Sequence, residues 1–175
     1  TGSMNWFDSI NHALTTLPSG GFSTHDASIG YFDSVLVETI IIVFMFIAGI
    51  NFTLMWFIKE REFKKAFADE EFRYYGIYVL VASLAIAGAL IGSGTSVGTS
   101  LRHSVFHVIS IGTSTGYGTT DYASDSWPMV THFIIFILMI VGASAGSTAG
   151  GLKLLRITLA FKVAMRELVK IAQPR

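Results

Sequence analysis

Three long apolar stretches stand out along the chain and predict helices that cross a membrane. The first covers residues 35–58, the second residues 74–91, and the third opens at Trp127-Pro128 and runs to residue 141. A bilayer core about 30 Å thick needs roughly 20 helical residues. The first two stretches are close to or above that length. The third, at about 14 residues, is too short to cross alone.

A segment rich in glycine, serine and alanine follows the third apolar stretch. It covers residues 142–151, and a helical pattern resumes at Leu152. Each glycine costs a helix about 1 kcal/mol relative to alanine, and a helix broken at membrane depth frees backbone groups that need protein or water partners. We therefore expect a non-helical loop within the membrane at residues 142–151.

The composition supports a membrane protein and excludes several kinds of chemistry. Hydrophobic residues make up 51% of the chain and charged residues 14%, whereas a soluble domain carries about 25% charge. The absence of cysteine excludes disulfides, thiolate metal sites and cysteine nucleophiles. Equal numbers of acidic and basic residues give no sign of a nucleic-acid partner. We see no nucleophile–base pairing, so we expect no enzyme activity and no catalytic residue.

The basic residues predict which loops face the cytoplasm. All but one of the 12 lie in residues 59–73 and 153–175, and the exception is Arg102. Loops rich in lysine and arginine remain on the cytoplasmic side. We therefore expect residues 1–34 and 92–127 to face the outside.

The chain also contains an internal repeat, because a shift of 95 positions aligns two blocks before the first and third apolar stretches. The aligned identities are Ser9 with Ser104, His12 with His107, Ser19 with Ser114, Gly21 with Gly116, Thr24 with Thr119 and Asp26 with Asp121. Each block has a half-apolar stretch of about 12 residues, too short to cross a bilayer, and then a glycine-containing turn. We expect a short helix that enters from outside and returns as non-helical backbone, buried in protein or lining a pore.

The turns of this repeat have the chemistry of a potassium filter. The second turn, Ser114-Thr115-Gly116-Tyr117-Gly118, differs from the potassium-channel sequence TVGYG at two positions, and the first reads Ser19-Gly20-Gly21-Phe22-Ser23. In such a filter, backbone carbonyls replace the hydration shell of the ion, and glycine supplies the backbone angles that this requires. The partially negative C-terminus of each short helix, which is expected to point to the cavity below the filter, also favours a cation. We predict that both turns bind K⁺ through carbonyl oxygens, without a side-chain metal site.

Two motifs carry a resemblance to a known family. Residues 20–26 (GGFSTHD) and 145–153 (AGSTAGGLK) resemble the Trk/Ktr/HKT potassium-transport superfamily, most closely its bacterial TrkH-type subunits. The resemblance implies an all-α membrane protein of re-entrant pore-loop repeats (outer helix, pore helix, filter, inner helix), four of which surround one pore with pseudo-fourfold symmetry. It makes residues 1–58 a partial repeat, residues 59–73 a cytoplasmic loop, and residues 74–175 a complete repeat with a broken inner helix.

The resemblance also implies a function and a gate. The chain would form part of the pore-forming subunit of a potassium uptake system, a symporter or a channel, in the bacterial inner membrane with the filter side outward. The loop at residues 142–151 would block the path below the filter and move on activation. The residues expected to form this gate are Gly142, Gly146, Ser147, Thr148, Gly150, Gly151 and Lys153.

The implied partners follow from the same resemblance. They are membrane lipid, the remaining pore repeats, a second copy in a homodimer, and a cytosolic nucleotide-binding ring of the TrkA or KtrA type, with K⁺ as the transported ion and no bound cofactor. The basic helix expected after residue 152 would offer the ring a docking surface.

Other interpretations of the sequence stay open at this point. The chain could belong to a tetrameric-type potassium channel with two pore repeats, or be a non-conducting membrane scaffold with vestigial turns. The glycine loop could serve close helix packing through small residues. A phosphate-binding loop is disfavoured, because Leu152 stands where the motif needs lysine.

Overall fold

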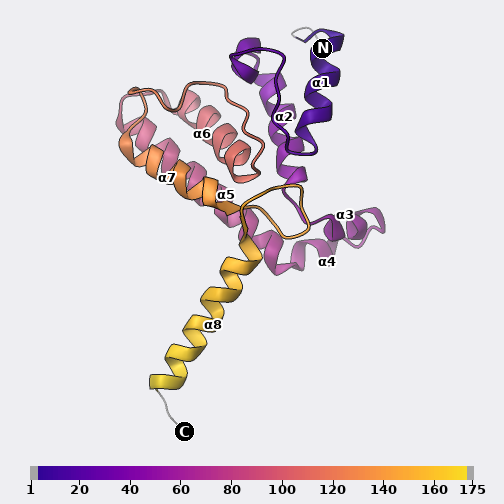
Figure 1. Cartoon of the computed structure of the whole chain (residues 1–175), viewed down its shortest axis with the longest axis vertical. Helices are drawn as coiled ribbons and strands as arrows, with labels where there is room; N and C mark the ends of the chain where they lie inside the picture. The colour runs from indigo at the N-terminus through magenta and orange to yellow at the C-terminus, as the bar shows by residue number, and fades with distance from the viewer. Residues whose placement is uncertain (1–3, 173–175) are drawn as a thin grey trace.

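The computed structural model describes residues 4–172, which fold almost entirely into helices (Figure 1). The elements, in chain order, are α1 (Trp6–Thr16), the 3₁₀ helix η1 (Ser28–Phe32), α2 (Val35–Ala48), α3 (Phe52–Lys59), α4 (Phe63–Ala68), α5 (Glu70–Gly92), α6 (Val97–Gly112), α7 (Met129–Ile140), β1 (Val141–Gly142), β2 (Leu152–Lys153) and α8 (Leu154–Ala172). The short helices expected before the two turns are α1, with 11 residues, and α6, with 16.

Among residues 4–172, α5 is the one helix that is by itself long and apolar enough to cross a membrane. Its 23 residues give a length of roughly 34 Å. The helix begins at Glu70, four residues before the expected start at residue 74. The hydropathy pattern misses the first turn of α5 because that turn is charged. Asp69 caps the helix by accepting a 2.8 Å hydrogen bond from the amide of Phe72.

The first expected span is not one continuous helix, so that prediction is wrong. It is divided into α2 and α3, which meet at 101°. At the break, a Cβ atom on Gly49 would lie 2.4 Å from the hydroxyl of Tyr75, so this side chain of α5 occupies the space that a larger residue would need. Asn51 then starts α3 by accepting a 3.0 Å hydrogen bond from the amide of Thr53. The two helices count as a second span only when they are taken together.

Helix α7 ends one residue before the predicted end of the third apolar stretch, at Ile140. Pro128 is its N-cap and not its first helical residue. The segment between α7 and α8 is non-helical, and α8 begins at Leu154, two residues after the expected position. We did not predict that β1 and β2 would pair in parallel and bring the two ends of the segment together.

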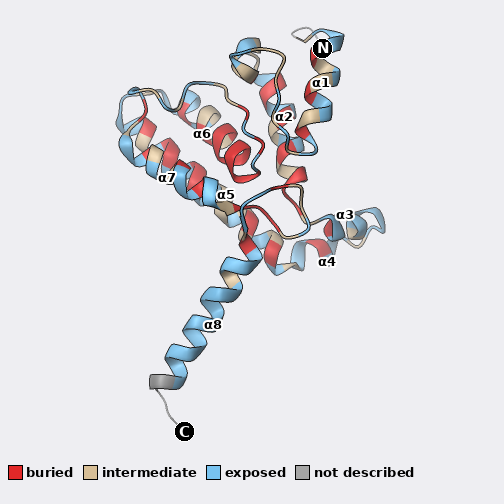
Figure 2. Cartoon of the chain, viewed as in Figure 1, coloured by how far each residue is buried: buried red, intermediate tan, exposed pale blue. Residues whose placement is uncertain are grey.

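Helix α6 lies at the centre of the packing. One buried cluster joins it to α5 and α7 through Ile86, Val108 and Leu138, and a second joins it to α2 through Met45 and Phe106. Figure 2 shows buried residues concentrated on these facing surfaces, whereas α8 extends away and is almost wholly exposed.

Candidate functional site

The two candidate filter turns share unusual backbone conformations at equivalent positions. Ser19 and Ser114 have positive φ angles of 56° and 59°, and Gly21 and Gly116 have φ angles of 65° and 86°. These angles lie in the left-handed region that glycine adopts without steric cost. The two serines pay a small energetic cost for the same region, which indicates that the surrounding hydrogen bonds impose it.

Those hydrogen bonds recur with the same spacing of 95 positions. In the first copy, the amides of Gly20 and Gly21 donate to the carbonyl of Thr15, at 2.8 and 3.2 Å. In the second copy the equivalent bonds have the same lengths and run from Thr115 and Gly116 to Ser110. Each short helix therefore ends in the same hydrogen-bonded turn.

A hydroxyl group on each short helix also holds one carbonyl of the turn. The Ser110 hydroxyl donates to the carbonyl of Tyr117 at 2.7 Å. The Thr15 hydroxyl lies 2.9 Å from the carbonyl of Phe22 and shares its single proton between that carbonyl and the carbonyl of Asn11, also at 2.9 Å. We call the bonds to Phe22 and Tyr117 the hydroxyl clamps. Within residues 4–172, no donor lies against the first three carbonyls of either turn, those of residues 19–21 and 114–116.

The two aligned histidines anchor the chain that leaves each turn. Each Nδ1 lies on the carbonyl oxygen of the residue four positions earlier, at 2.7 Å for His12 and 2.8 Å for His107. On the other side of the ring, Nε2 of His12 lies 3.1 Å from the Ser23 hydroxyl, and Nε2 of His107 lies 3.2 Å from the Thr120 carbonyl. Both side chains are buried, and each of these hydrogen bonds lies within one copy of the repeat.

The two turns lie side by side. A Cβ atom added to Gly21 would lie 1.7 Å from the carbonyl oxygen of Thr115, so the two backbones are in direct contact there. The Tyr117 hydroxyl reaches across to the first copy and lies 2.5 Å from the hydroxyl of Thr15. The structure thus brings together the two sets of candidate filter residues, which are almost a hundred positions apart in sequence.

The glycine-rich loop contacts the first residue of each turn. Within the loop, the Thr148 hydroxyl lies 2.7 Å from the hydroxyl of Ser19, and the amide of Gly150 donates to the hydroxyl of Ser114 at 2.8 Å. Ser19 and Ser114 are equivalent residues of the repeat. One segment therefore lies against both turns at the same level.

The loop is held in place by the break between α2 and α3. The amides of Ser144 and Thr148 donate to the carbonyls of Gly49 and Ala48, at 3.2 and 3.3 Å, and the Gly146 carbonyl accepts from the amide of Phe52 at 3.2 Å. Two interrupted helices thus satisfy each other's backbone groups, as burial away from water requires. The sequence indicated the loop but not the break that supports it.

Lys153 also stabilises the loop from its far end. Its ammonium group donates to the carbonyl of Ala149 and lies 3.5 Å from the hydroxyl of Ser147. Of the four candidate gate glycines, Gly142 has the least space for a side chain, since a Cβ atom there would lie 1.9 Å from the carbonyl oxygen of Gly150. The predicted gate residues therefore form one connected segment.

Two acidic residues that sequence analysis did not assign have defined partners. The Glu71 carboxylate accepts from the backbone amide of Ala145 in the loop and from the side-chain amide of Asn51, the latter at 3.4 Å. Glu38 on α2 accepts two hydrogen bonds from Arg102 on α6, at 2.7 and 2.8 Å. An acidic residue close to the end of an apolar stretch is the only sequence signal that either contact gives.

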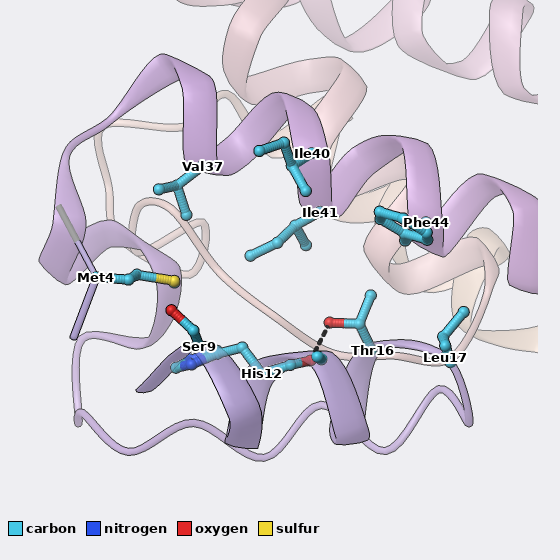
Figure 3. Close-up of a pocket in the computed structure, with 10 residues that line it drawn as sticks. Met4, Ser9, His12, Thr16, Leu17, Val37, Ile40, Ile41 and Phe44 are labelled. Atoms are coloured by element: carbon cyan, nitrogen blue, oxygen red, sulfur yellow. Dashed lines mark hydrogen bonds between the residues drawn. The ribbon is translucent and has the colours of Figure 1, made fainter. Parts of the chain in front are cut away.

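A cavity of about 310 Å³ lies between α1 and α2 (Figure 3). Its walls are mostly apolar and include Ile40, Ile41 and Phe44, and none of the candidate filter or gate residues lines it. We therefore separate this cavity from the candidate ion path. Among the described residues there is also no group of three or more acidic or histidine side chains that could hold a metal ion.

Helix α8, outside the expected membrane spans, contacts the start of α5. The Lys162 ammonium donates to Glu70 at 2.7 Å, and this hydrogen bond raises the pKa of Lys162. Both side chains are largely exposed, so the pair contributes little to stability.

Comparisons with known proteins agree with the motifs. The family model of TrkH, a cation transport protein, matches residues 1–175. The chain is 39% identical to the Trk system potassium uptake protein TrkH of Halomonas elongata and 37% identical to TrkG of Escherichia coli K12, over 98% of its length in each case. It spans about 36% of the length of these relatives. The crystal structure of the potassium transporter TrkH from Vibrio parahaemolyticus has a TM-score of 0.91 and 36% identity, covering 98% of this chain and 37% of that one.

Proposed function

Because this chain belongs to the TrkH family of cation transport proteins, we propose that it forms part of the pore-forming subunit of a potassium uptake transporter. The observation that carries this proposal is the pair of equivalent turns in direct contact, both touched by one loop. The relatives named as potassium uptake proteins support K⁺ as the transported ion. No covalent chemistry is part of the proposal.

Ion binding is assigned to the backbone. The carbonyls of residues 19–21 and 114–116 have no donor against them among the described residues, so their oxygens can replace water around a cation. The carbonyls of Phe22 and Tyr117 are engaged by the hydroxyl clamps. The proposal therefore places the main contacts in the first three residues of each turn, with the rest of the filter supplied by further repeats outside this chain.

The loop at residues 142–151 is the proposed gate. Its contacts with Ser19 and Ser114 support a location at the inner end of both turns. A loop held by a few hydrogen bonds can move, whereas regular helices resist bending. In this proposal the loop blocks the path in its present position and is displaced on activation.

The remaining parts of the proposal concern orientation and partners. The filter side faces outward in the bacterial inner membrane, because the basic segments are expected to face the cytoplasm. Helix α8, which is basic and exposed, is the proposed docking surface for a cytosolic nucleotide-binding ring of the TrkA or KtrA type. The complete subunit is proposed to form a homodimer.

Deleting part of the gate tests the proposal. We expect a complete transporter that lacks residues 145–150 to take up Rb⁺ into liposomes several-fold faster than the unaltered protein, because the block is removed. The matched control combines the deletion with Gly21→Ala. This variant should not conduct if the ions pass through the filter turns, whereas a non-specific leak would persist.

Thermal melts separate this function from that of a non-conducting scaffold. Carbonyls that bind K⁺ stabilise the folded state by mass action. The complete transporter should therefore melt at a higher temperature in KCl than in NaCl of equal concentration. Equal melting temperatures, together with unchanged uptake in a folded deletion variant, would favour the scaffold.

A further inference from the structure

The buried carboxylate of Glu71 joins the two non-helical breaks of the chain. Its side chain lies in the first turn of α5, and the residue is only 8% exposed. One carboxylate oxygen accepts from the amide of Ala145 in the loop, and the other accepts from the Asn51 side chain at the α2–α3 break. A buried charge is tolerated only where hydrogen bonds compensate for lost hydration. At this buried position, the carboxylate of Glu71 therefore needs both hydrogen bonds.

Among the described residues, Glu71 is the one charged group outside residues 142–153 that forms a hydrogen bond with the loop. The backbone bonds from Ser144 and Thr148 to the α2–α3 break are between neutral groups and measure 3.2 and 3.3 Å. A hydrogen bond to an ionised carboxylate is about twice as strong as a neutral one. Glu71 also stands on a regular 23-residue helix, whereas both of its partners lie on irregular backbone. The rigid element therefore positions the irregular ones.

The neighbouring residue, Glu70, points to a different part of the molecule. Its carboxylate is exposed and accepts from Lys162 on α8 at 2.7 Å and from the Tyr74 hydroxyl at 3.0 Å. Glu70 and Glu71 are the same type of residue, and both lie in the first turn of α5. Only Glu71 contacts the loop, which makes Glu70 a matched control.

We propose that Glu71 is the positioning residue that holds the loop of residues 142–151 in its blocking position beneath the filter turns. The inference rests on the proposed function of the loop as a gate, and adds the group that keeps the gate closed. Removing the carboxylate weakens the bond to Ala145 and releases the loop without altering either turn. The hydrogen bonds of Glu71 among the described residues go to Ala145 and Asn51, not to a residue of the filter turns.

The test compares Glu71→Gln and Glu71→Ala with Glu70→Gln in the complete transporter. Each variant also carries Ser147→Cys as a reporter in the loop, in a background without other cysteines. We expect Glu71→Ala to react with a charged thiol reagent about tenfold faster than the parent, the factor that loss of one hydrogen bond to a charged group gives. Glu71→Gln, whose amide oxygen can still accept from Ala145, should react faster than the parent by a smaller factor. Rb⁺ uptake should rise in parallel, and Glu70→Gln should match the parent in both measurements.

The two measurements separate the inference from the proposed function. Unchanged labelling in folded Glu71→Gln and Glu71→Ala proteins would overturn the inference, even if deletion of residues 145–150 raises uptake and supports the gate. Faster labelling with unchanged uptake would support Glu71 as the anchor and overturn the gate. An equal increase in labelling for Glu70→Gln would also overturn the inference, because the effect would then belong to the start of α5 as a whole.

Discussion

The two copies of the repeat have the same local geometry in different surroundings. Both short helices end in the same hydrogen-bonded turn. Helix α6 is nevertheless enclosed by α5, α7 and α2, and its Phe106 and Val108 are fully buried. Helix α1 packs on α2 and leaves large apolar side chains exposed, such as Trp6 at 86%. The turn is therefore determined by its own sequence, and the burial of the helix by its neighbours.

The contacts between the copies also run in one direction. Tyr117 of the second copy is 1% exposed and reaches the first copy, whereas the equivalent Phe22 is 76% exposed. Conversely, Gly21 touches the second copy, whereas a Cβ atom on Gly116 would meet open space. The first copy thus offers its glycine to the second copy, and the second copy offers its aromatic ring to the first. In the proposed pore, further copies of the repeat outside this chain continue this arrangement at both ends.

The largest effect is expected from Gly21→Ala. The added Cβ atom would lie 1.7 Å from the Thr115 carbonyl oxygen, so the two turns would have to separate. We expect Rb⁺ uptake by the complete transporter to fall to background, with a lower melting temperature in KCl. Alanine in the left-handed region adds a further cost of about 1 kcal/mol.

Gly116→Ala is the matched variant in the other copy. Within this chain it pays only the cost of its positive φ angle, because a Cβ atom there has open space. We expect as large a loss of uptake as for Gly21→Ala, since the proposed pore places the next copy of the repeat against Gly116. A mild loss would mean that no further copy of the repeat lies against Gly116, and would contradict the proposed arrangement of the repeats around one pore.

Features that depend on local sequence could be predicted. The repeat register identified both turns, because their hydrogen bonds join residues at most seven positions apart. The end of α7 was predicted to within one residue, since a run of glycine and serine ends a helix. Membership of the TrkH family, predicted from two short motifs, is confirmed by a family match over the whole chain.

Features that depend on distant contacts could not be predicted. The break at Gly49 lies in a continuous apolar stretch, and the side chain that packs against it, that of Tyr75, comes from another helix. Glu71 and Ala145 are 74 positions apart, and no periodicity connects them. Apolar patterning predicts which residues avoid water, but it does not indicate where two broken helices satisfy each other's backbone.

An intermediate effect is expected from the ion pair that joins α2 to α6. The Arg102 guanidinium donates two hydrogen bonds to the buried Glu38 carboxylate, and the equivalent positions of the other copy hold Phe7 and Phe133. Glu38→Gln should cost about 1.5–3 kcal/mol, the range for hydrogen bonds to charged groups. A thermal melt of the complete transporter measures the loss.

A double-mutant cycle sharpens this result. Combining Glu38→Gln with Arg102→Gln should cost less than the sum of the two single changes, because both remove the same interaction. Asp33→Asn is the control, since the Asp33 side chain is 89% exposed and its contact with Arg102 is a surface pair of little energetic value. Strictly additive losses would show that the pair does not link the two helices.

The smallest effect is expected from the hydroxyl clamps. Ser110 is fully buried, so Ser110→Ala leaves the Tyr117 carbonyl without its donor, at a cost of about 1 kcal/mol. If that energy fixes the geometry of the turn, the preference for K⁺ over Na⁺ in uptake should fall roughly fivefold. Thr15→Val removes the equivalent clamp from the partly exposed first copy, where water can replace the hydroxyl, and it also removes the 2.5 Å contact with the Tyr117 hydroxyl. Tyr117→Phe removes that contact and leaves the clamp, and the further loss in Thr15→Val should be smaller than the loss in Ser110→Ala. Equal losses of K⁺ preference from the two clamps would mean that both carbonyls are equally shielded from water in the complete transporter.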